Sequence, residues 1–323
     1  MKSISAFWLI VLLFTGCQTV VSTGTAYDID DDKALYDAAE HGSLEVSRYL
    51  LTKGADIEFK DSKFWTPLFA ATVYNNTKVV QYLTSQGADI GVISYRGWTL
   101  LMQACFNGNI DLVKHFISLG LDVDDKNHKG QTALHLATSE NHLDVVNLLL
   151  KEGANIDAST DEGWSAFLIA SFKGFDSLFD LLVKKEADLK AVNSKGQTAL
   201  HLLISEGNLK LFRSLIEQDI DINVQDNEGT TPLMEAAIFG ELKMLKRLYK
   251  KDGDIHLQDK KGQTALMHAA LNEEFEVARF LLAKGALIST KDRQGKTVID
   301  LVKASTKMRA PQKAAMLAYL ESH

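Results

Sequence analysis

Few side chains of this sequence are placed to carry out bond chemistry. Its 323 residues include 9 His and 2 Cys. They contain no His-Glu-x-x-His metal-binding motif, no glycine-rich phosphate loop and no complete Gly-x-Ser-x-Gly nucleophile turn. The nearest approach is Gly163-Trp164-Ser165-Ala166-Phe167, which lacks the second glycine. We therefore expect no catalytic residue, no metal site and no cofactor.

The histidines and the thiol outside the N-terminus have structural interpretations. His135 and His201 occupy the same place in a repeating pattern, two repeats apart. Stacked helices lie about 8–10 Å apart, so roughly 20 Å would separate the two rings, and one metal ion cannot reach both. We expect these rings to form hydrogen bonds within their own repeat. Cys105 lies among small residues, and we expect it to be a buried thiol in helix packing rather than a redox site.

The pattern that positions these residues has a period of 33 residues. One threonine or serine serves as an anchor in each repeat, and a glycine lies two residues before it in every repeat except the first, where Phe64 replaces it. Chance cannot produce eight such registers. The anchors are Thr66, Thr99, Thr132, Ser165, Thr198, Thr231, Thr264 and Thr297.

This pattern resembles the ankyrin repeat. Its Thr-Pro-Leu-His signature is most complete in Thr132-Ala133-Leu134-His135 and in Thr231-Pro232-Leu233-Met234. The resemblance implies an all-α solenoid of helix-turn-helix units with β-hairpin or turn connections. We expect one ankyrin-repeat domain over residues 30–323. It comprises an N-terminal cap at about 30–62, seven regular repeats at about 63–292 and a C-terminal cap at about 293–323.

Local chemistry accounts for the same pattern. The anchor hydroxyl can cap a short first helix, and a second helix carries apolar pairs such as Val145-Val146 on one face. Glycines end the first helix in several repeats, because a left-handed residue costs glycine little. Asn75 and Asn141 can replace glycine there. Glu273 does so less easily, so we expect the eighth unit to turn differently.

Composition narrows the possible functions. The chain is 46% hydrophobic and has a formal charge of −7, which excludes a wholly disordered chain. An acidic chain without an evident basic patch is not expected to bind nucleic acid. Two cysteines are too few for a disulfide-built scaffold.

The N-terminus has the pattern of an export signal. Lys2 precedes an apolar run from Ile4 to Phe14, which is too short to span a bilayer. The segment 13–17, ending in Cys17, resembles a bacterial lipoprotein signal, with Phe14 where that family usually has leucine. The resemblance implies removal of residues 1–16, lipidation of Cys17 and a tether over residues 17–29. A plain signal peptide and an uncleaved anchor are the alternatives.

An aromatic surface is predicted from the positions next to the anchors. In ankyrin-like arrays, partners contact the hairpin tips and the inner side of the first helices. All three tryptophans after the signal directly precede an anchor. Exposed aromatic patches usually mark binding sites, although these rings could instead pack between hairpins and stiffen the array. The predicted partner-binding residues, on a concave face, are Trp65, Val73, Tyr74, Tyr95, Arg96, Trp98, Phe106, Trp164, Phe172, Ile238 and Phe239.

The function expected from these features is non-enzymatic protein binding. The lipoprotein resemblance implies a protein held in the bacterial envelope by its lipid, facing the periplasm, with Gln18 favouring the outer membrane. We expect a monomer. The partners are expected to be proteins. Two alternatives are an immunity or inhibitor protein against a secreted toxin or lipase, and an architectural envelope scaffold without one tight partner.

Overall fold

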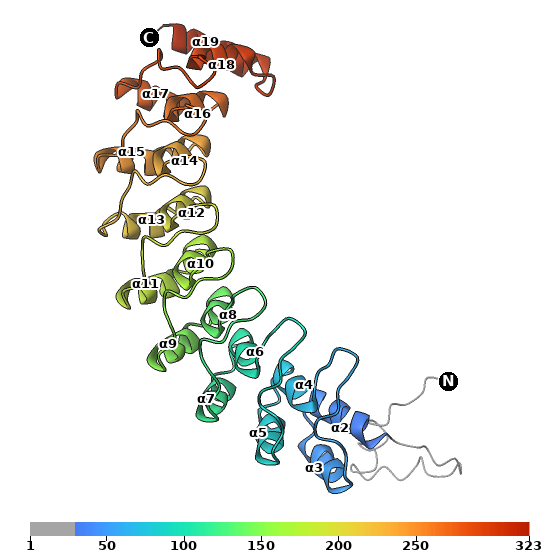
Figure 1. Ribbon diagram of the computed structural model, residues 1–323. Coiled ribbons are helices and arrows are strands. Elements are labelled where there is room, and N and C mark those ends of the chain that lie inside the picture. The colour runs from blue at the N-terminus through green and yellow to red at the C-terminus, as the bar shows by residue number, and fades with distance from the viewer. Residues whose placement is uncertain (1–29, 323) are drawn as a thin grey trace. The chain divides into compact units, whose positions relative to one another are not determined.

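The computed structural model describes residues 30–322, and it contains 18 helices and no strand in that range. The helices form an all-helical repeat solenoid of consecutive pairs (Figure 1). The expected fold class is therefore confirmed. Cys17, the signal and the tether lie outside the described residues. No helix in the described range combines the length and hydropathy that a membrane span requires.

The first helices of the pairs are α2 (Asp31–Glu40), α4 (Pro67–Val73), α6 (Leu100–Asn107), α8 (Ala133–Ser139), α10 (Ala166–Lys173), α12 (Ala199–Ser205), α14 (Pro232–Ile238), α16 (Ala265–Leu271) and α18 (Val298–Ala304). The second helices are α3 (Leu44–Thr52), α5 (Thr77–Ser85), α7 (Ile110–Ser118), α9 (Leu143–Lys151), α11 (Asp176–Lys184), α13 (Leu209–Leu215), α15 (Leu242–Lys250), α17 (Phe275–Ala283) and α19 (Ala310–Glu321).

The described chain divides into two compact units. Unit 1 ends at Asp161 and holds α2–α9, and unit 2 begins at Glu162 and holds α10–α19 (Figure 1). In each unit, first helices pack on first helices of the neighbouring pairs and on their own second helices. This is the arrangement expected when each repeat buries its apolar face only against its neighbours.

The anchor residues begin the first helices, as their chemistry predicts. Thr66 Oγ1 accepts a hydrogen bond from the backbone N–H of Phe69 at 3.2 Å, which satisfies one of the free donors of α4. The corresponding anchors in the other repeats occupy the N-cap of their first helices in the same extended conformation. The 33-residue spacing therefore places the start of each first helix.

Left-handed residues end most of the first helices. Gly108 and Gly174 do so with φ values of 72° and 70°. Asn75 and Asn141 take the same conformation with φ of 61°. Glu273 also has φ of 64°, so the expectation that this unit turns differently is wrong. The backbone path of the repeat prevails there over the steric preference of a side chain with a Cβ atom.

The core of each unit lies between its first and second helices. In α6 and α7, Leu101, Cys105, Val113 and Phe116 have no exposed surface. Small residues such as Ala104 let the first helices approach closely. The remaining side of each first helix, together with the loop that precedes it, stays at the surface. We call this the first-helix face, and it carries the residues predicted to bind a partner.

Candidate binding surface

The loops before α4 and the later first helices are tight turns, and in most of them a polar side chain closes the turn. In the first of these, Asp61 Oδ1 accepts hydrogen bonds from the backbone N–H groups of Lys63 and Trp65, both at 2.8 Å. Asn127 closes the corresponding loop of a later repeat in the same way. The residue two before the anchor has positive φ in every repeat. These turns hold the residues directly before the anchors at the surface.

In unit 1, two predicted tryptophans pack on phenylalanines of their own repeats. The ring of Trp65 lies 5.5 Å from that of Phe69, and the ring of Trp98 lies 5.2 Å edge-on to that of Phe106. Neither tryptophan is fully buried. The expected alternative, in which the rings only stiffen the array, therefore accounts for the covered part of each ring but not for the part that stays at the surface.

These aromatic rings line a pocket of about 400 Å³ in unit 1. The pocket lies between the first two turns and the adjoining helices α4 and α6, and five of the predicted residues meet there. Its lining residues are Lys63, Trp65, Phe69, Ser94, Tyr95, Arg96, Trp98, Gln103 and Phe106. We call it the hairpin pocket. It brings five of the eleven predicted residues together in one concave site.

Two cations flank the hairpin pocket and rest on aromatic faces. Lys63 Nζ lies 4.9 Å from the ring centre of Trp65, and the guanidinium carbon of Arg96 lies 5.2 Å from that of Tyr95. Within residues 30–322, neither cation is ion-paired with a carboxylate. Cation–π contacts at exposed sites contribute only about 0.5–1 kcal/mol, so both charges remain available to an anion.

Val73 and Tyr74 lie in unit 1 at the end of α4, outside the hairpin pocket. Tyr74 is half exposed. A hydrogen bond to Glu40, with smaller contributions from burial and the Glu40 charge, raises the pKa of the Tyr74 hydroxyl. These two residues therefore extend the surface toward α2 without joining the pocket.

In unit 2, the predicted residues form smaller groups. Trp164 lies edge-on to Phe172, with their ring centres 5.5 Å apart, and Phe172 is exposed. Ile238 is partly exposed at the end of α14, and Phe239 follows it with half of its surface exposed. Both groups lie on the first-helix face of unit 2. The structure shows no contact between the two groups within the described residues.

Four lining residues of the hairpin pocket were not singled out from the sequence. Lys63 lies in the turn three residues before its anchor. Hairpin tips are expected to contact partners, so the sequence contained the signal for this residue. Gln103 lies four residues after its anchor, where most repeats have an apolar residue. A polar residue at that position is the signal that could have found it. Phe69 and Ser94 lie at positions whose side chains usually build the repeat, so no signal distinguished them.

The residues with potential chemistry have structural roles. His135 Nδ1 accepts a hydrogen bond from the backbone N–H of Thr132 at 3.1 Å. His201 does the same toward Thr198, and its Nε2 donates to the carbonyl oxygen of Thr230 at 3.0 Å. Burial lowers the pKa of His201, which keeps the ring neutral. The interpretation of local hydrogen bonding is therefore confirmed, and His201 also joins two repeats.

Ser165 and Cys105 also serve the fold. Ser165 caps α10, and its Oγ accepts a hydrogen bond from the backbone N–H of Leu168 at 3.3 Å. Cys105 has no exposed surface, and burial raises the pKa of its thiol, so it has little thiolate character. Both positions match the structural interpretations made from the sequence.

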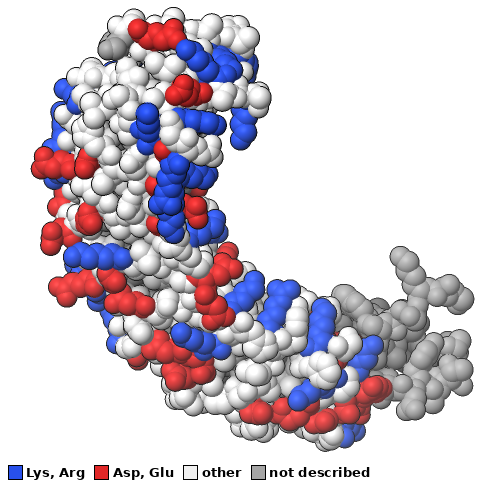
Figure 2. Space-filling model, turned by 45° about the horizontal axis from the view of Figure 1, so that its top comes forward, with Lys and Arg blue, Asp and Glu red and all other residues white. Residues whose placement is uncertain are grey.

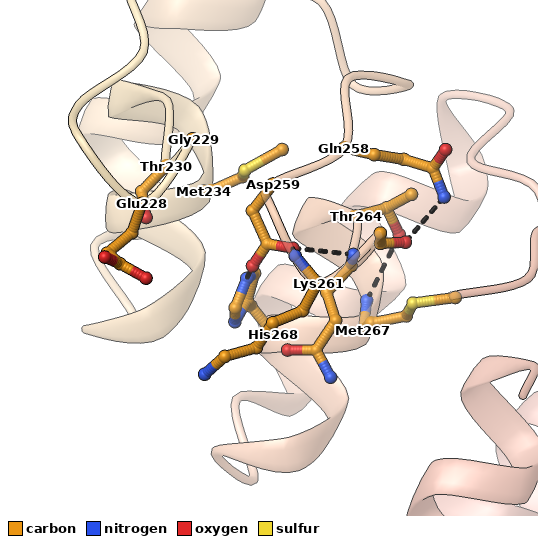
Figure 3. Close-up of polar contacts among 12 residues, drawn as sticks. Glu228, Gly229, Thr230, Met234, Gln258, Asp259, Lys261, Thr264, Met267 and His268 are labelled. Carbon is orange, nitrogen blue, oxygen red and sulfur yellow. Dashed lines mark hydrogen bonds and ion pairs between the residues drawn. The ribbon is translucent and has the colours of Figure 1, made fainter. Parts of the chain in front are cut away.

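A carboxylate–imidazole pair in unit 2 joins buried Asp259 to partly exposed His268. His268 Nε2 lies 3.0 Å from Asp259 Oδ2, and Asp259 also accepts bonds from the backbone of Lys261 and Gln263 (Figure 3). Burial would raise the pKa of Asp259, but the hydrogen bonds from His268 and the backbone outweigh it and lower the pKa. Within the described range, no hydroxyl or thiol bonds to the His268 ring. The pair therefore ties a turn to α16.

The preceding repeat has a different pair at the same two positions. Asp226 replaces Asp259, and Glu235 on α14 replaces His268. Burial, and after it the charge of Asp226, raise the pKa of Glu235 to about 7. Two like charges thus take the place of an attractive pair. This carboxyl group is a pH-sensitive feature of unit 2. The described residues contain no group of three or more His, Cys, Asp or Glu side chains that could hold a metal ion.

The geometry of unit 1 supports binding. The hairpin pocket presents exposed aromatic rings and two cations on a rigid set of turns and helices. Trp, Tyr and Arg are the residues that most often carry the binding energy of an interface. A larger cavity of about 690 Å³ near α19 is lined mainly by apolar residues such as Leu282, Leu287 and Leu320. It contains none of the residues predicted from the sequence.

Comparison with protein families identifies the repeat. The model for ankyrin repeats in three copies matches residues 8–94, 92–160, 156–226 and 221–292. A search of the curated proteins finds no match. The matched segments cover most of the chain and have the same period that places the anchors at the helix N-caps. The chain belongs to the ankyrin-repeat family.

Proposed function

We propose that this protein is a non-enzymatic module that binds a partner protein through the first-helix face. Ankyrin repeats are protein–protein interaction modules, and the family is typically non-enzymatic. The observation that carries the proposal is the hairpin pocket, where Trp65, Tyr95, Arg96, Trp98 and Phe106 meet without entering the core. A chain folding for stability alone has no reason to leave so many rings at the surface.

The proposal also includes the place where the protein acts. We infer that a lipid on Cys17 holds it in the bacterial envelope, facing the periplasm. The support is the sequence Leu13-Phe14-Thr15-Gly16-Cys17 after a short apolar run. Several acyl chains on one residue would give stable anchoring, whereas a single chain would be marginal.

Affinity capture from envelope extracts tests the binding function. The native protein is compared with a Trp65→Ala/Trp98→Ala variant, which alters unit 1, and with a Trp164→Ala variant, which alters unit 2. A partner bound at the hairpin pocket is expected to be captured by the native protein and by Trp164→Ala but lost with the double variant. A partner that is a secreted lipase or cell-wall toxin would make this chain an inhibitor.

A matched control distinguishes specific recognition from non-specific binding by exposed aromatic residues. Tyr49 is an exposed aromatic residue on α3, a second helix, and lies outside the pocket. The Tyr49→Ala variant is expected to capture the same partner as the native protein. Circular dichroism establishes that each variant is folded. Capture that is equal for the native protein and the double variant, or absent for both, would rule out the pocket as the binding site.

Extraction and mass measurement test the anchor. The native protein, expressed in a bacterium with its own signal, is expected to partition into detergent and to start at an acylated Cys17. A Cys17→Ser variant is expected to remain in the aqueous phase. An unmodified cysteine in the exported native protein would refute lipid anchoring without affecting the binding proposal.

A further inference from the structure

A ladder of backbone hydrogen bonds joins consecutive turns in each unit. In unit 1, His128 N–H donates to the Arg96 carbonyl at 3.2 Å, and Asp161 N–H donates to that of Lys129 at 3.1 Å. Four bonds of the same type, from 2.7 to 2.9 Å, join the turns of unit 2. Among the described residues, one hydrogen bond of this ladder is missing, the one between the first two turns. The N–H of Tyr95 makes no bond to the carbonyl of Lys63.

Phe64 accounts for this interruption. In the other turns a glycine lies against the following turn, and a Cβ atom at Gly262 would come within 2.6 Å of the backbone nitrogen of Arg293. Only glycine therefore allows the close approach that the ladder bond requires. Phe64 carries a Cβ atom and a ring at this position, with φ of 62° and 71% of its surface exposed. The first two turns consequently stay apart.

The hairpin pocket lies where these two turns fail to close. Lys63 and Trp65 line it from the first turn, and Tyr95 and Arg96 line it from the second. Two backbone groups that pair in the other turns, the Lys63 carbonyl and the Tyr95 N–H, thus border the pocket without a protein partner in the described chain. The ring N–H of Trp65 is also buried without an acceptor there. Native proteins rarely leave a buried polar group such as this ring N–H unpaired without a reason. The two backbone groups belong to exposed residues, so an incoming segment can reach them.

The charge around the pocket indicates the chemistry of the occupant. Residues 30–161 carry 11 basic and 19 acidic side chains, a formal charge of −8, which disfavours nucleic acid. Lys63 and Arg96 are nevertheless exposed at the pocket rim, and neither is ion-paired within residues 30–322. In Figure 2, basic side chains are spaced along the upper side of unit 1, while acidic side chains gather along its lower edge. Screening limits charge effects to about 8 Å, so the nearest charges matter most. In the two turns that border the pocket, residues 61–65 and 94–98, the two cations outnumber the one carboxylate, Asp61.

We propose that the hairpin pocket receives an extended acidic segment of a partner protein, which takes the place of the missing turn-to-turn contact. An apolar side chain of the segment enters between Trp65 and Trp98. A neighbouring carboxylate lies between the two rim cations, and the segment backbone bonds to the free groups of Lys63 and Tyr95. This inference rests on the proposed function and specifies its partner. An extended peptide supplies both a backbone donor and an acceptor, as the pocket requires.

Fluorescence polarisation with a labelled probe tests this pocket. The probe is the blocked pentapeptide Asp-Glu-Phe-Glu-Asp, and the comparison peptide is Lys-Lys-Phe-Lys-Lys. The native protein is expected to bind the acidic probe at least tenfold more tightly than the basic one. Phe64→Gly, which lets the turns close, and Lys63→Glu/Arg96→Glu are each expected to weaken binding of the acidic probe at least tenfold. Lys260→Glu/Lys261→Glu, at a turn of unit 2, is the charge-matched control and is expected to bind as the native protein does.

Amide hydrogen exchange of the native protein is a second readout that needs no variant. The Tyr95 amide is expected to exchange more slowly when the acidic probe is bound. No probe binding by the native protein, equal binding of the two peptides, or unchanged binding by Phe64→Gly would overturn the inference. A partner captured from envelope extracts equally by native protein and Phe64→Gly would leave the proposed function standing while this inference fails. Loss of capture with Trp65→Ala/Trp98→Ala but not with Phe64→Gly would likewise retain the function and reject the acidic-segment inference.

Discussion

Among single residues, two positions depart from the repeat without serving its structure. Phe64 holds a left-handed conformation that disfavours residues with a Cβ atom by roughly 1–2 kcal/mol. Glu235 places a carboxyl group in a buried position next to another acid. Strain that the fold does not need is a reasonable indicator of a functional site. Each departure has a measurable consequence.

Replacing Phe64 by glycine is expected to stabilise the protein by about 1–2 kcal/mol. The variant relieves the left-handed strain and permits the missing ladder bond, although glycine gains more freedom in the unfolded chain. Urea unfolding measures the difference. The reverse comparison is Gly97→Ala, which is expected to be destabilising because a Cβ atom there would lie 2.7 Å from the His128 ring. A Phe64→Gly protein less stable than the native one would contradict this account of the turn.

Glu235 is expected to make unit 2 less stable as the pH rises. The folded pKa is about 7, above the ordinary value of 4.5, because of burial and the Asp226 charge. Between these two values the unfolded chain ionises first, so stability falls with rising pH and is lowest above pH 7. The Glu235→Gln variant is expected to lack this pH-dependent loss of stability. Its stability advantage over the native protein is expected to be about 2 kcal/mol larger at pH 8 than at pH 4. Chemical unfolding of both proteins at pH 4 and pH 8 measures this difference in stability. The same variant–native difference at both pH values would refute the raised pKa of Glu235.

Among the helices, stability depends on how each short first helix begins. Helices of seven or eight residues are too short to be stable alone, so capping and packing must maintain them. The anchor hydroxyls supply the caps, and residues such as His201 join a helix to the next turn. Not every second helix begins in this way. Ser43, at the N-cap of α3, makes no side-chain capping bond.

Thr231→Ala is expected to cost about 1 kcal/mol of stability. The substitution removes the acceptor that bonds the backbone N–H of Met234 at 3.2 Å and leaves a buried donor unpaired. Ser43→Ala is the matched control, expected to change stability by less than about 0.5 kcal/mol because no capping bond is lost. Thermal unfolding compares the two. Equal costs at both sites would show that the anchor hydroxyl does not act as a cap.

Across the whole molecule, the two compact units differ in charge. Unit 1 has a formal charge of −8, whereas residues 162–322 carry 23 basic and 22 acidic side chains and a charge of +1. In repeat proteins, each unit of structure is stabilised by its nearest neighbours. Damage to one part of the array is therefore expected to remain mostly local.

Core truncations test this locality. Leu101 on α6 and Leu245 on α15 are both fully buried, one in each unit. Each Leu→Ala substitution is expected to cost about 2–4 kcal/mol. Hydrogen exchange with mass spectrometry is expected to show faster exchange mainly in the unit that carries the substitution. Equal acceleration in both units would show that the array unfolds as one cooperative body.

The repeat, the starts of the first helices and the lack of a recognisable catalytic motif follow from the order of the amino acids. The anchor Thr231 and the left-handed Gly108 act through their own backbone and nearest neighbours, so their roles can be read from spacing. The roles of His135 and His201 within a repeat were predictable for the same reason. Because these interactions are local and recur every 33 residues, long-range packing changes their geometry little.

The grouping of the predicted surface residues into one site depends instead on three-dimensional packing. The hairpin pocket joins residues from successive repeats, and spacing along the chain does not show how closely two turns approach. The replacement of a glycine by Phe64 is visible in the sequence, but its interruption of the ladder, which leaves Tyr95 N–H unpaired, is not. That outcome depends on a distance between turns, which the packing of α4 against α6 sets. Glu273 shows the same limit, because its repeat's backbone path imposes a conformation that the residue alone disfavours.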